Sequence, residues 1–204
     1  MDANKNTPDA LTEAQSLLLI KEMIEVSRSK FKRDGILFVV WGWIQFITFF
    51  FLSYLPSVLT PGYQIMSIVR PLRVILPVIG IAYSFYYIFQ QRKKVQTYIG
   101  VSLRYIWISL FLCLVLTNLI QFNVLHSINF ELQHPIFMLF IAFAITVTGG
   151  ILRFRLIVIG GIIFAALAYI ASYFALQEQV LIEAIGWVIA FIIPGHILYT
   201  GRKK

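Results

Sequence analysis

The chain has 204 residues, of which 59% are hydrophobic and 13% are charged, compared with about 45–50% and about 25% in a soluble domain. This composition excludes an ordinary soluble globule, a disordered chain and a nucleic-acid-binding domain, and it indicates an integral membrane protein. The net charge is +8, but most of the basic residues fall between apolar runs, which is typical of orientation signals and lipid-headgroup contacts.

The first 35 residues form a separate polar segment, because the first apolar run begins only at Ile36. Thr12, with Gln15 three residues later, fits a capping box and predicts a helix from Glu13 to about Arg33. Its apolar and charged residues fall on two faces, so we expect a cytoplasmic amphipathic helix. Three locations stay open for it: the headgroup layer, the underside of a bundle, or a partner helix. The late apolar run also predicts that no secretory signal is cleaved.

Residues 36–204 carry six apolar runs and form the second predicted domain. A run of about 20 residues crosses a bilayer core at about 1.5 Å per residue. Five runs reach that length, and the fourth is the short one. Pro56 bounds the first run, and Pro71 precedes the second. We therefore expect an all-α, polytopic membrane helical bundle with six transmembrane helices, at residues 36–55, 72–90, 102–122, 135–152, 156–176 and 180–200.

The charges between the runs predict the orientation of the bundle. With the N-terminus inside, all but Arg70 and Arg73 of the 17 Lys and Arg residues fall on the inner side. The acids beyond residue 35 all map outside, and they are Glu131, Glu178 and Glu183. The positive-inside rule thus predicts that both termini are cytoplasmic. A five-helix arrangement would place the basic C-terminus outside.

Three basic clusters on the predicted cytoplasmic side are candidate contacts for membrane lipids with anionic headgroups or for an acidic protein partner. Their residues are Arg28, Lys30, Lys32, Arg33, Arg92, Lys93, Lys94, Arg202, Lys203 and Lys204.

Pro194, Gly195 and His196 interrupt the sixth run near its inner end. A proline frees a backbone carbonyl, and a glycine lets another group approach. The break is either a structural kink or a site in which His196 acts as a pH-sensitive or ligand-binding group. Pro77 with Gly80, in the second run, allows the same two interpretations.

The fifth run carries a face of small residues, which are Gly161, Ala165, Ala168 and Ser172. Such a face lets another helix approach closely in lipid. It predicts either packing inside the bundle or dimerisation.

Catalytic and metal sites are not expected. His126 and His134 are interpreted as scattered loop residues around Glu131, because a metal site needs at least three well-placed ligands. No charged residue is expected deep in a span, which argues against an ion-coupled pump. Walker, GxSxG and HExxH motifs are absent from the sequence. We therefore expect no enzyme activity and no cofactor.

Three short motifs carry a resemblance, and they are Phe31–Gly35 (FKRDG), Trp41–Trp43 (WGW) and Pro194–Leu198 (PGHIL). With them the chain resembles small uncharacterised polytopic proteins of bacterial inner membranes, over most of its length. Those proteins have no established activity. The resemblance therefore implies a location in the bacterial inner membrane and no site residues.

The leading functional hypothesis is a non-enzymatic interaction or regulatory protein of the membrane. It would use the helix over residues 13–33 and the basic inner loops to hold a cytoplasmic or membrane protein partner. The alternative is a carrier or flippase for a lipid-like, uncharged substrate, suggested by the apolar interior and the helix breakers at Pro77, Gly80, Pro194 and Gly195. A cavity open to the membrane would favour transport, and a tightly filled bundle would favour interaction.

Overall fold

The computed structural model describes residues 38–59, 63–91 and 98–200, which are helical apart from short turns. These residues contain no β-strand, which confirms the predicted all-α fold. The amphipathic helix predicted over residues 13–33 lies outside the described residues. In chain order the elements are η1 (Ile47–Tyr54), α2 (Leu55–Leu59), α3 (Tyr63–Gln91), α4 (Tyr98–Leu125), α5 (Phe130–Leu152), α6 (Arg155–Ala171), α7 (Leu176–Trp187), η2 (Val188–Ile192) and α8 (Ile193–Thr200).

Two helices are built from several of these elements. Residues 38–46 continue through η1 into α2, and we call the helix Phe38–Leu59 the N-terminal span. α7, η2 and α8 form a second continuous helix, Leu176–Thr200, which we call the C-terminal span. These two helices, α5, and the segments Val69–Tyr86 of α3 and Gly100–Leu125 of α4 are long and apolar enough to cross a membrane. α6 is apolar as well, but it has only 17 residues.

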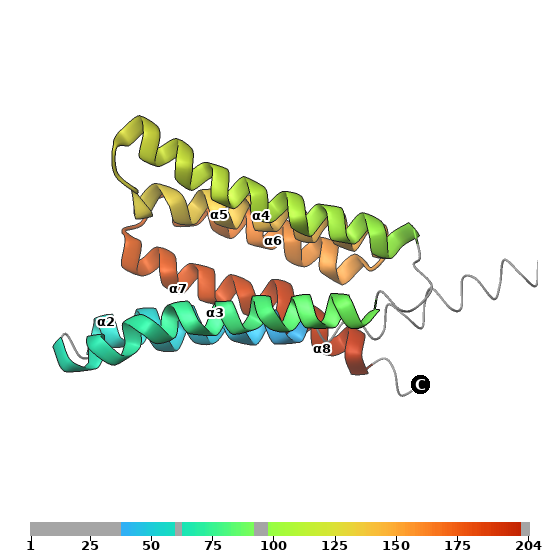
Figure 1. Cartoon of the computed structure of the whole chain (residues 1–204), viewed down its shortest axis with the longest axis horizontal. Helices are drawn as coiled ribbons and strands as arrows, with labels where there is room; N and C mark the ends of the chain where they lie inside the picture. Colours follow the sequence, from blue (N-terminus) through green and yellow to red (C-terminus); the bar gives the residue numbers. More distant parts are fainter. Residues whose placement is uncertain (1–37, 60–62, 92–97, 201–204) are drawn as a thin grey trace, which may run out of the picture.

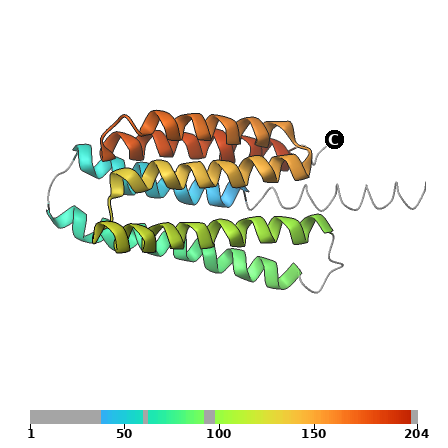
Figure 2. The same ribbon diagram turned by 90° about the horizontal axis from the view of Figure 1, so that it is seen from above.

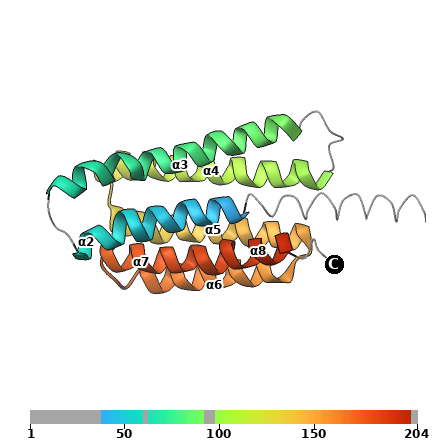
Figure 3. The ribbon, with the colours of Figure 1, turned by 90° about the horizontal axis from the view of Figure 1, so that it is seen from below.

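The helices run along one common axis in two layers (Figure 1). One layer contains α4, α5 and α6, and the other contains α3, the N-terminal span and the C-terminal span (Figures 2 and 3). Phe38 and Thr200 lie at the same end of the bundle, which we call the terminal end. The α4–α5 and α6–α7 turns lie at the opposite end, which we call the far end.

The densest packing lies between α5, α6 and the C-terminal span. α5 turns sharply into α6 at Arg153, which adopts a left-handed conformation with φ of 52°. A Cβ on Gly161 of α6 would lie 2.9 Å from the backbone nitrogen of Thr146 on α5. Gly161 and Ala168 are buried and Ala165 is half-buried, whereas Ser172 lies beyond the end of α6 and is exposed. The part of the small-residue face that lies in α6 therefore packs inside the bundle, the first of its two predicted roles.

α3 and α4 lie at one edge of the bundle and pack against different helices (Figure 3). α3 packs on the N-terminal span, where Gly80 lies close to Trp41 and the indole of Trp41 donates to Ser84 Oγ at 2.8 Å. α4 packs on α5, and its Trp107 ring meets Phe38 edge-on at 6.3 Å. In the most apolar windows of α3 and α4, 11% and 6% of the residues are buried, compared with 56% in the C-terminal span. Most of the apolar surface of these two helices therefore faces outward.

Both composite spans contain a π-helical segment that ends two residues before a proline. η1 precedes Pro56, and η2 precedes Pro194. In each case the residue before the proline donates its N–H to the carbonyl five residues back. A proline has no N–H and clashes with the carbonyl four residues before it, and a wider turn relieves that clash. Pro56 therefore does not end the first helix, which continues to Leu59.

The predicted ends of the other spans also differ from the observed helices. α3 begins at Tyr63 and passes through Pro71 and Pro77, so Pro71 does not mark its start. α5 begins at Phe130, before the predicted start at residue 135, because the side chain of Asn129 accepts the N–H of Leu132 and caps the helix.

The short helix is α6 rather than α5, contrary to the prediction. α5 has 23 residues, whereas α6 ends at Ala171. The apolar residues Tyr173 and Phe174 follow in the turn, so the apolar run is longer than the helix. Hydropathy marks where the chain is apolar, but the satisfaction of backbone groups determines where a helix ends.

Candidate functional site

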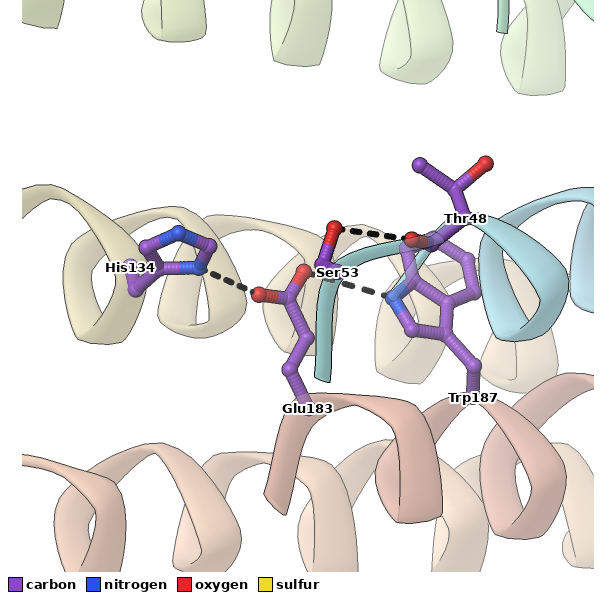
Figure 4. A network of polar contacts seen from close by, with 5 residues as sticks. All are labelled: Thr48, Ser53, His134, Glu183 and Trp187. Atoms are coloured by element: carbon purple, nitrogen blue, oxygen red, sulfur yellow. Dashed lines mark hydrogen bonds and ion pairs between the residues drawn. The ribbon is translucent and has the colours of Figure 1, made fainter. Parts of the chain in front are cut away.

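A cluster of polar side chains is buried between α5, the C-terminal span and η1, towards the far end of the bundle. His134 lies near the start of α5, and its Nδ1 is 2.6 Å from Oε2 of Glu183 on α7. Trp187, one helical turn after Glu183, donates its Nε1–H to the other carboxylate oxygen, Oε1, at 3.3 Å. Figure 4 shows both side chains directed at the Glu183 carboxylate.

The N-terminal span covers this cluster with an aromatic ring and two hydroxyl groups. The ring of Phe49 meets the imidazole of His134 edge-on at 5.8 Å. Thr48, which is buried, donates its hydroxyl proton to the carbonyl of Ile44, and Ser53 donates to the carbonyl of Thr48, both at 2.8 Å. Figure 4 includes the second bond. Because each hydroxyl proton is used within the N-terminal span, neither group donates to Glu183.

The electrostatics of the cluster depend on the pairing of His134 with Glu183. The side chain of Glu183 is 3% exposed, and that of His134 is 20% exposed. A carboxylate inside an apolar span is costly unless it is paired. Removal of one partner from a buried ion pair typically costs about 3–5 kcal/mol, because the remaining charge stays buried. The pair therefore joins α5 to α7 and makes each residue dependent on the other.

A second polar group joins α4 to α5 beside this cluster. Gln133, the neighbour of His134, donates from Nε2 to Oδ1 of Asn118 at 2.7 Å, and Asn118 donates to the carbonyl of Leu114. Gln121 accepts the backbone N–H of Asn129 at 3.2 Å. The far end of the bundle thus carries several polar contacts between helices.

The C-terminal span carries polar residues on the face that it buries. Gln179, Glu183 and Trp187 recur every four residues, and all three are buried. Gln179 donates from Nε2 to the carbonyl of Phe174 at 2.9 Å, whereas its Oε1 has no hydrogen-bond partner. This four-residue spacing is the sequence feature that could have revealed the cluster.

The ten basic residues predicted to contact lipids or a partner lie outside the described residues. The predicted helix-break residues can be placed. Pro194 and Gly195 are buried, and a Cβ on Gly195 would lie 3.0 Å from the backbone nitrogen of Val39. Nδ1 of His196 is 2.9 Å from the carbonyl oxygen of Ile192 on its own helix. The three residues therefore lie in a continuous helix that packs closely on the N-terminal span, and the local irregularity is the preceding π-helical segment, η2.

One expectation from the sequence is wrong. His134 is not a scattered loop residue, because it lies in α5 and pairs with Glu183. Charged residues lie within several helices of spanning length, among them Glu183 in the C-terminal span and Arg73 in α3. Arg73 donates from Nε to the carbonyl of Leu52 at 2.6 Å.

Within residues 38–59, 63–91 and 98–200, no three His, Cys, Asp or Glu side chains are grouped so that they could hold a metal ion. The described site is therefore a two-residue ionisable pair with an indole donor. Comparisons of the chain with protein-family models, with curated proteins and with solved structures find no significant match.

Proposed function

We propose that the protein is a non-enzymatic interaction or regulatory protein of the membrane, which binds its partner at the terminal end of the bundle. The observation that carries this proposal is the gathering of helix ends next to the basic segments of the sequence. The helix ends Phe38, Gln91, Tyr98 and Thr200 all lie at the terminal end (Figures 1 to 3).

The basic clusters are joined to these helix ends by a few residues. Arg33 precedes Phe38 by five positions, and Arg92–Lys94 lies between α3 and α4. Arg202 follows Thr200 by two positions. The exposed Arg153, in the α5–α6 turn, and the exposed Arg155, the first residue of α6, lie at the same end. The helix ends that adjoin these basic segments in the sequence therefore lie at one end of the bundle.

The opposite end of the bundle carries exposed carboxylate groups. Glu131 and Glu178 are exposed near the starts of α5 and α7, at the far end. By the positive-inside rule the terminal end is cytoplasmic, and the far end faces outside. In this arrangement α6 also crosses the membrane, which brings the number of spans to six, and a bacterial inner membrane is the proposed location. The partner would be an acidic protein surface, assisted by anionic lipid headgroups.

The packing around the predicted helix breakers supports interaction over transport. Gly80 is covered by Ile44 and Trp41, and Gly195 is covered by Phe38 and Val39. These glycines allow close contact between helices. In a carrier, glycines at broken helices would border a substrate path.

The proposal is tested with the full-length protein, crosslinked in its native membrane and quantified by mass spectrometry. The triple variant Arg92→Gln, Lys93→Gln, Lys94→Gln should lower the yield of the stoichiometric partner severalfold, because it removes three basic charges from the segment between α3 and α4. Deletion of residues 1–33 should do the same. Arg70→Gln, at the far end, is the matched control and should leave the yield unchanged. Equal yields from all four proteins would contradict the proposal.

A carrier or flippase for a lipid-like, uncharged substrate is the second candidate, favoured by the π-helical segments η1 and η2. Such irregular turns occur frequently at functional sites. Purified protein in liposomes would then move labelled lipid faster than empty liposomes do. Movement at the background rate would remove this candidate.

A further inference from the structure

We propose that Glu183 and His134 form a proton-binding site inside the bundle, which exchanges its proton with the far end through His134. This site lies on α5 and α7 and is separate from the basic terminal end. Failure of the partner proposal would therefore leave it unaffected, and the converse also holds.

The geometry suits a site that holds one proton between two atoms. Nδ1 of His134 and Oε2 of Glu183 are 2.6 Å apart, which is a hydrogen-bond distance in either of two arrangements. The proton lies on the imidazole beside a carboxylate, or on the carboxyl group beside a neutral imidazole. Both arrangements have zero net charge. Gain of a second proton leaves a buried cation, and loss of the proton leaves a buried anion. One proton is therefore shared between the two residues.

The difference in exposure between the two side chains indicates the path by which the site exchanges its proton. The His134 side chain is 20% exposed, and that of Glu183 is 3% exposed. His134 lies only a few residues from the start of α5 at the far end. Imidazole can accept a proton on one nitrogen and release one from the other. A proton from the far end thus reaches the carboxylate most directly through the imidazole.

The surroundings of Glu183 accommodate a change in charge. Trp187 donates its indole N–H to Oε1, and this bond is possible whether or not Oε2 carries a proton. Gln179, one turn closer to the far end and 2% exposed, keeps an unpartnered amide oxygen, Oε1. A well-packed apolar pair is often as stabilising as a buried ion pair. Stability alone therefore does not account for an ionisable pair at this position.

Within the described part of the chain, the His134–Glu183 contact is the one ion pair between side chains. Other titratable or charged side chains lie on the elements of the bundle around it. They are Tyr54 on η1, Arg104, Tyr105 and Cys113 on α4, Glu131 on α5, Arg155 and Tyr169 on α6, Glu178 on α7 and His196 and Tyr199 on α8, with His126, Arg153 and Tyr173 in the turns and Arg70, Arg73, Tyr83 and Tyr86 on α3.

The test uses full-length protein in lipid nanodiscs and infrared difference spectra recorded between acidic and alkaline buffers. The wild-type spectrum should contain the C=O band of a protonated carboxyl group that is shielded from water. Glu183→Gln should lose this band, whereas Glu178→Gln, the exposed carboxyl on the same helix, should keep it. Identical spectra for the wild type and Glu183→Gln would overturn the proposal.

Two further variants keep the test decisive if Glu183→Gln does not fold. Trp187→Phe removes one hydrogen bond from the carboxyl group and should move the band to higher frequency. His134→Gln keeps a hydrogen-bonding side chain but cannot carry the proton. It should slow the appearance of the band after a pH jump severalfold. A band that is insensitive to both substitutions would assign the proton to another group and reject the site.

Discussion

Arg73 and Pro56 lie on neighbouring helices and meet at one carbonyl group. Pro56 has no N–H to donate to the carbonyl of Leu52, four residues before it. The guanidinium of Arg73 donates to this oxygen from Nε at 2.6 Å. The carbonyl group also gives a cation within an apolar span a polar partner. A proline leaves a carbonyl group without its helical donor, and an arginine brings a charge into an apolar span. The hydrogen bond from Arg73 to the carbonyl of Leu52 reduces both costs.

We expect Arg73→Met to lower the free energy of unfolding by about 1.5–3 kcal/mol, the usual contribution of a hydrogen bond to a charged group. In a Pro56→Ala background the loss should be smaller, because Ala at position 56 supplies the missing backbone N–H. Unfolding by SDS in mixed micelles measures both values as a double-mutant cycle. Arg70→Met is the control, since Arg70 is exposed. Equal losses in the two backgrounds would show that the two residues are not coupled.

At this scale the sequence predicts the chemistry of single residues but not their partners. Glu183 and His134 are 49 positions apart, and no local pattern relates them. The cost of an acid in an apolar run does imply that a partner exists. Its identity depends on which helices become neighbours, and that is decided by packing over the whole bundle.

α5 and α6 form a helical hairpin in which glycines set the distance between the two helices. A Cβ on Gly161 would meet the backbone of Thr146 at 2.9 Å and that of Ala142 at 3.1 Å. Around Gly150, also on α5, nothing lies within 4 Å of the same position. The two glycines lie in the same hairpin, but Gly161 is closely packed against the neighbouring helix and Gly150 faces open space.

The substitution Gly161→Ala should destabilise the protein by about 1–3 kcal/mol, because two backbones would have to move apart. The matched substitution Gly150→Ala should be neutral or should stabilise by up to about 1 kcal/mol, since alanine has the higher helix propensity. Thermal unfolding in the same detergent compares the two variants. The packing described for this hairpin would be refuted if Gly161→Ala were as stable as the wild type.

The helices themselves are largely predictable, whereas their ends are not. All six apolar runs of the sequence coincide with helices. Prolines are poor guides to the helix ends, because Pro56 and Pro71 lie within helices rather than at their limits. A π-helical turn or an arginine side chain can compensate for a proline, and both depend on neighbouring helices that hydropathy does not reveal.

The described part of the molecule has exposed Arg153 and Arg155 at the terminal end and exposed Glu131 and Glu178 near the far end. Charge alone predicts that the basic segments share a side, and the helix ends joined to them do lie at one end of the bundle. The order of helices within the two layers could not be predicted. Helices that are apolar on all sides give no indication of which neighbour they choose.

The proposed orientation predicts which turns are accessible from outside. In a Cys113→Ala background, Ser172→Cys lies in the α6–α7 turn at the far end and should react with an impermeant maleimide on intact bacterial spheroplasts. Arg155→Cys lies at the terminal end and should react only after permeabilisation. Both positions are exposed, so the comparison tests the side of the membrane rather than burial. The reverse pattern of labelling would invert the orientation.

The short length of α6 has a consequence for the surrounding lipid. Its 17 residues give an axis about 26 Å long, whereas a typical hydrocarbon core is about 30 Å thick. In the proposed six-span arrangement, acyl chains beside α6 must compress, while those beside the 28-residue α4 need not. Each ångström of mismatch costs a fraction of a kcal/mol. The two sides of the bundle therefore favour bilayers of different thickness. The cost of hydrophobic mismatch is lowest where a thin region of the membrane adjoins a thick one.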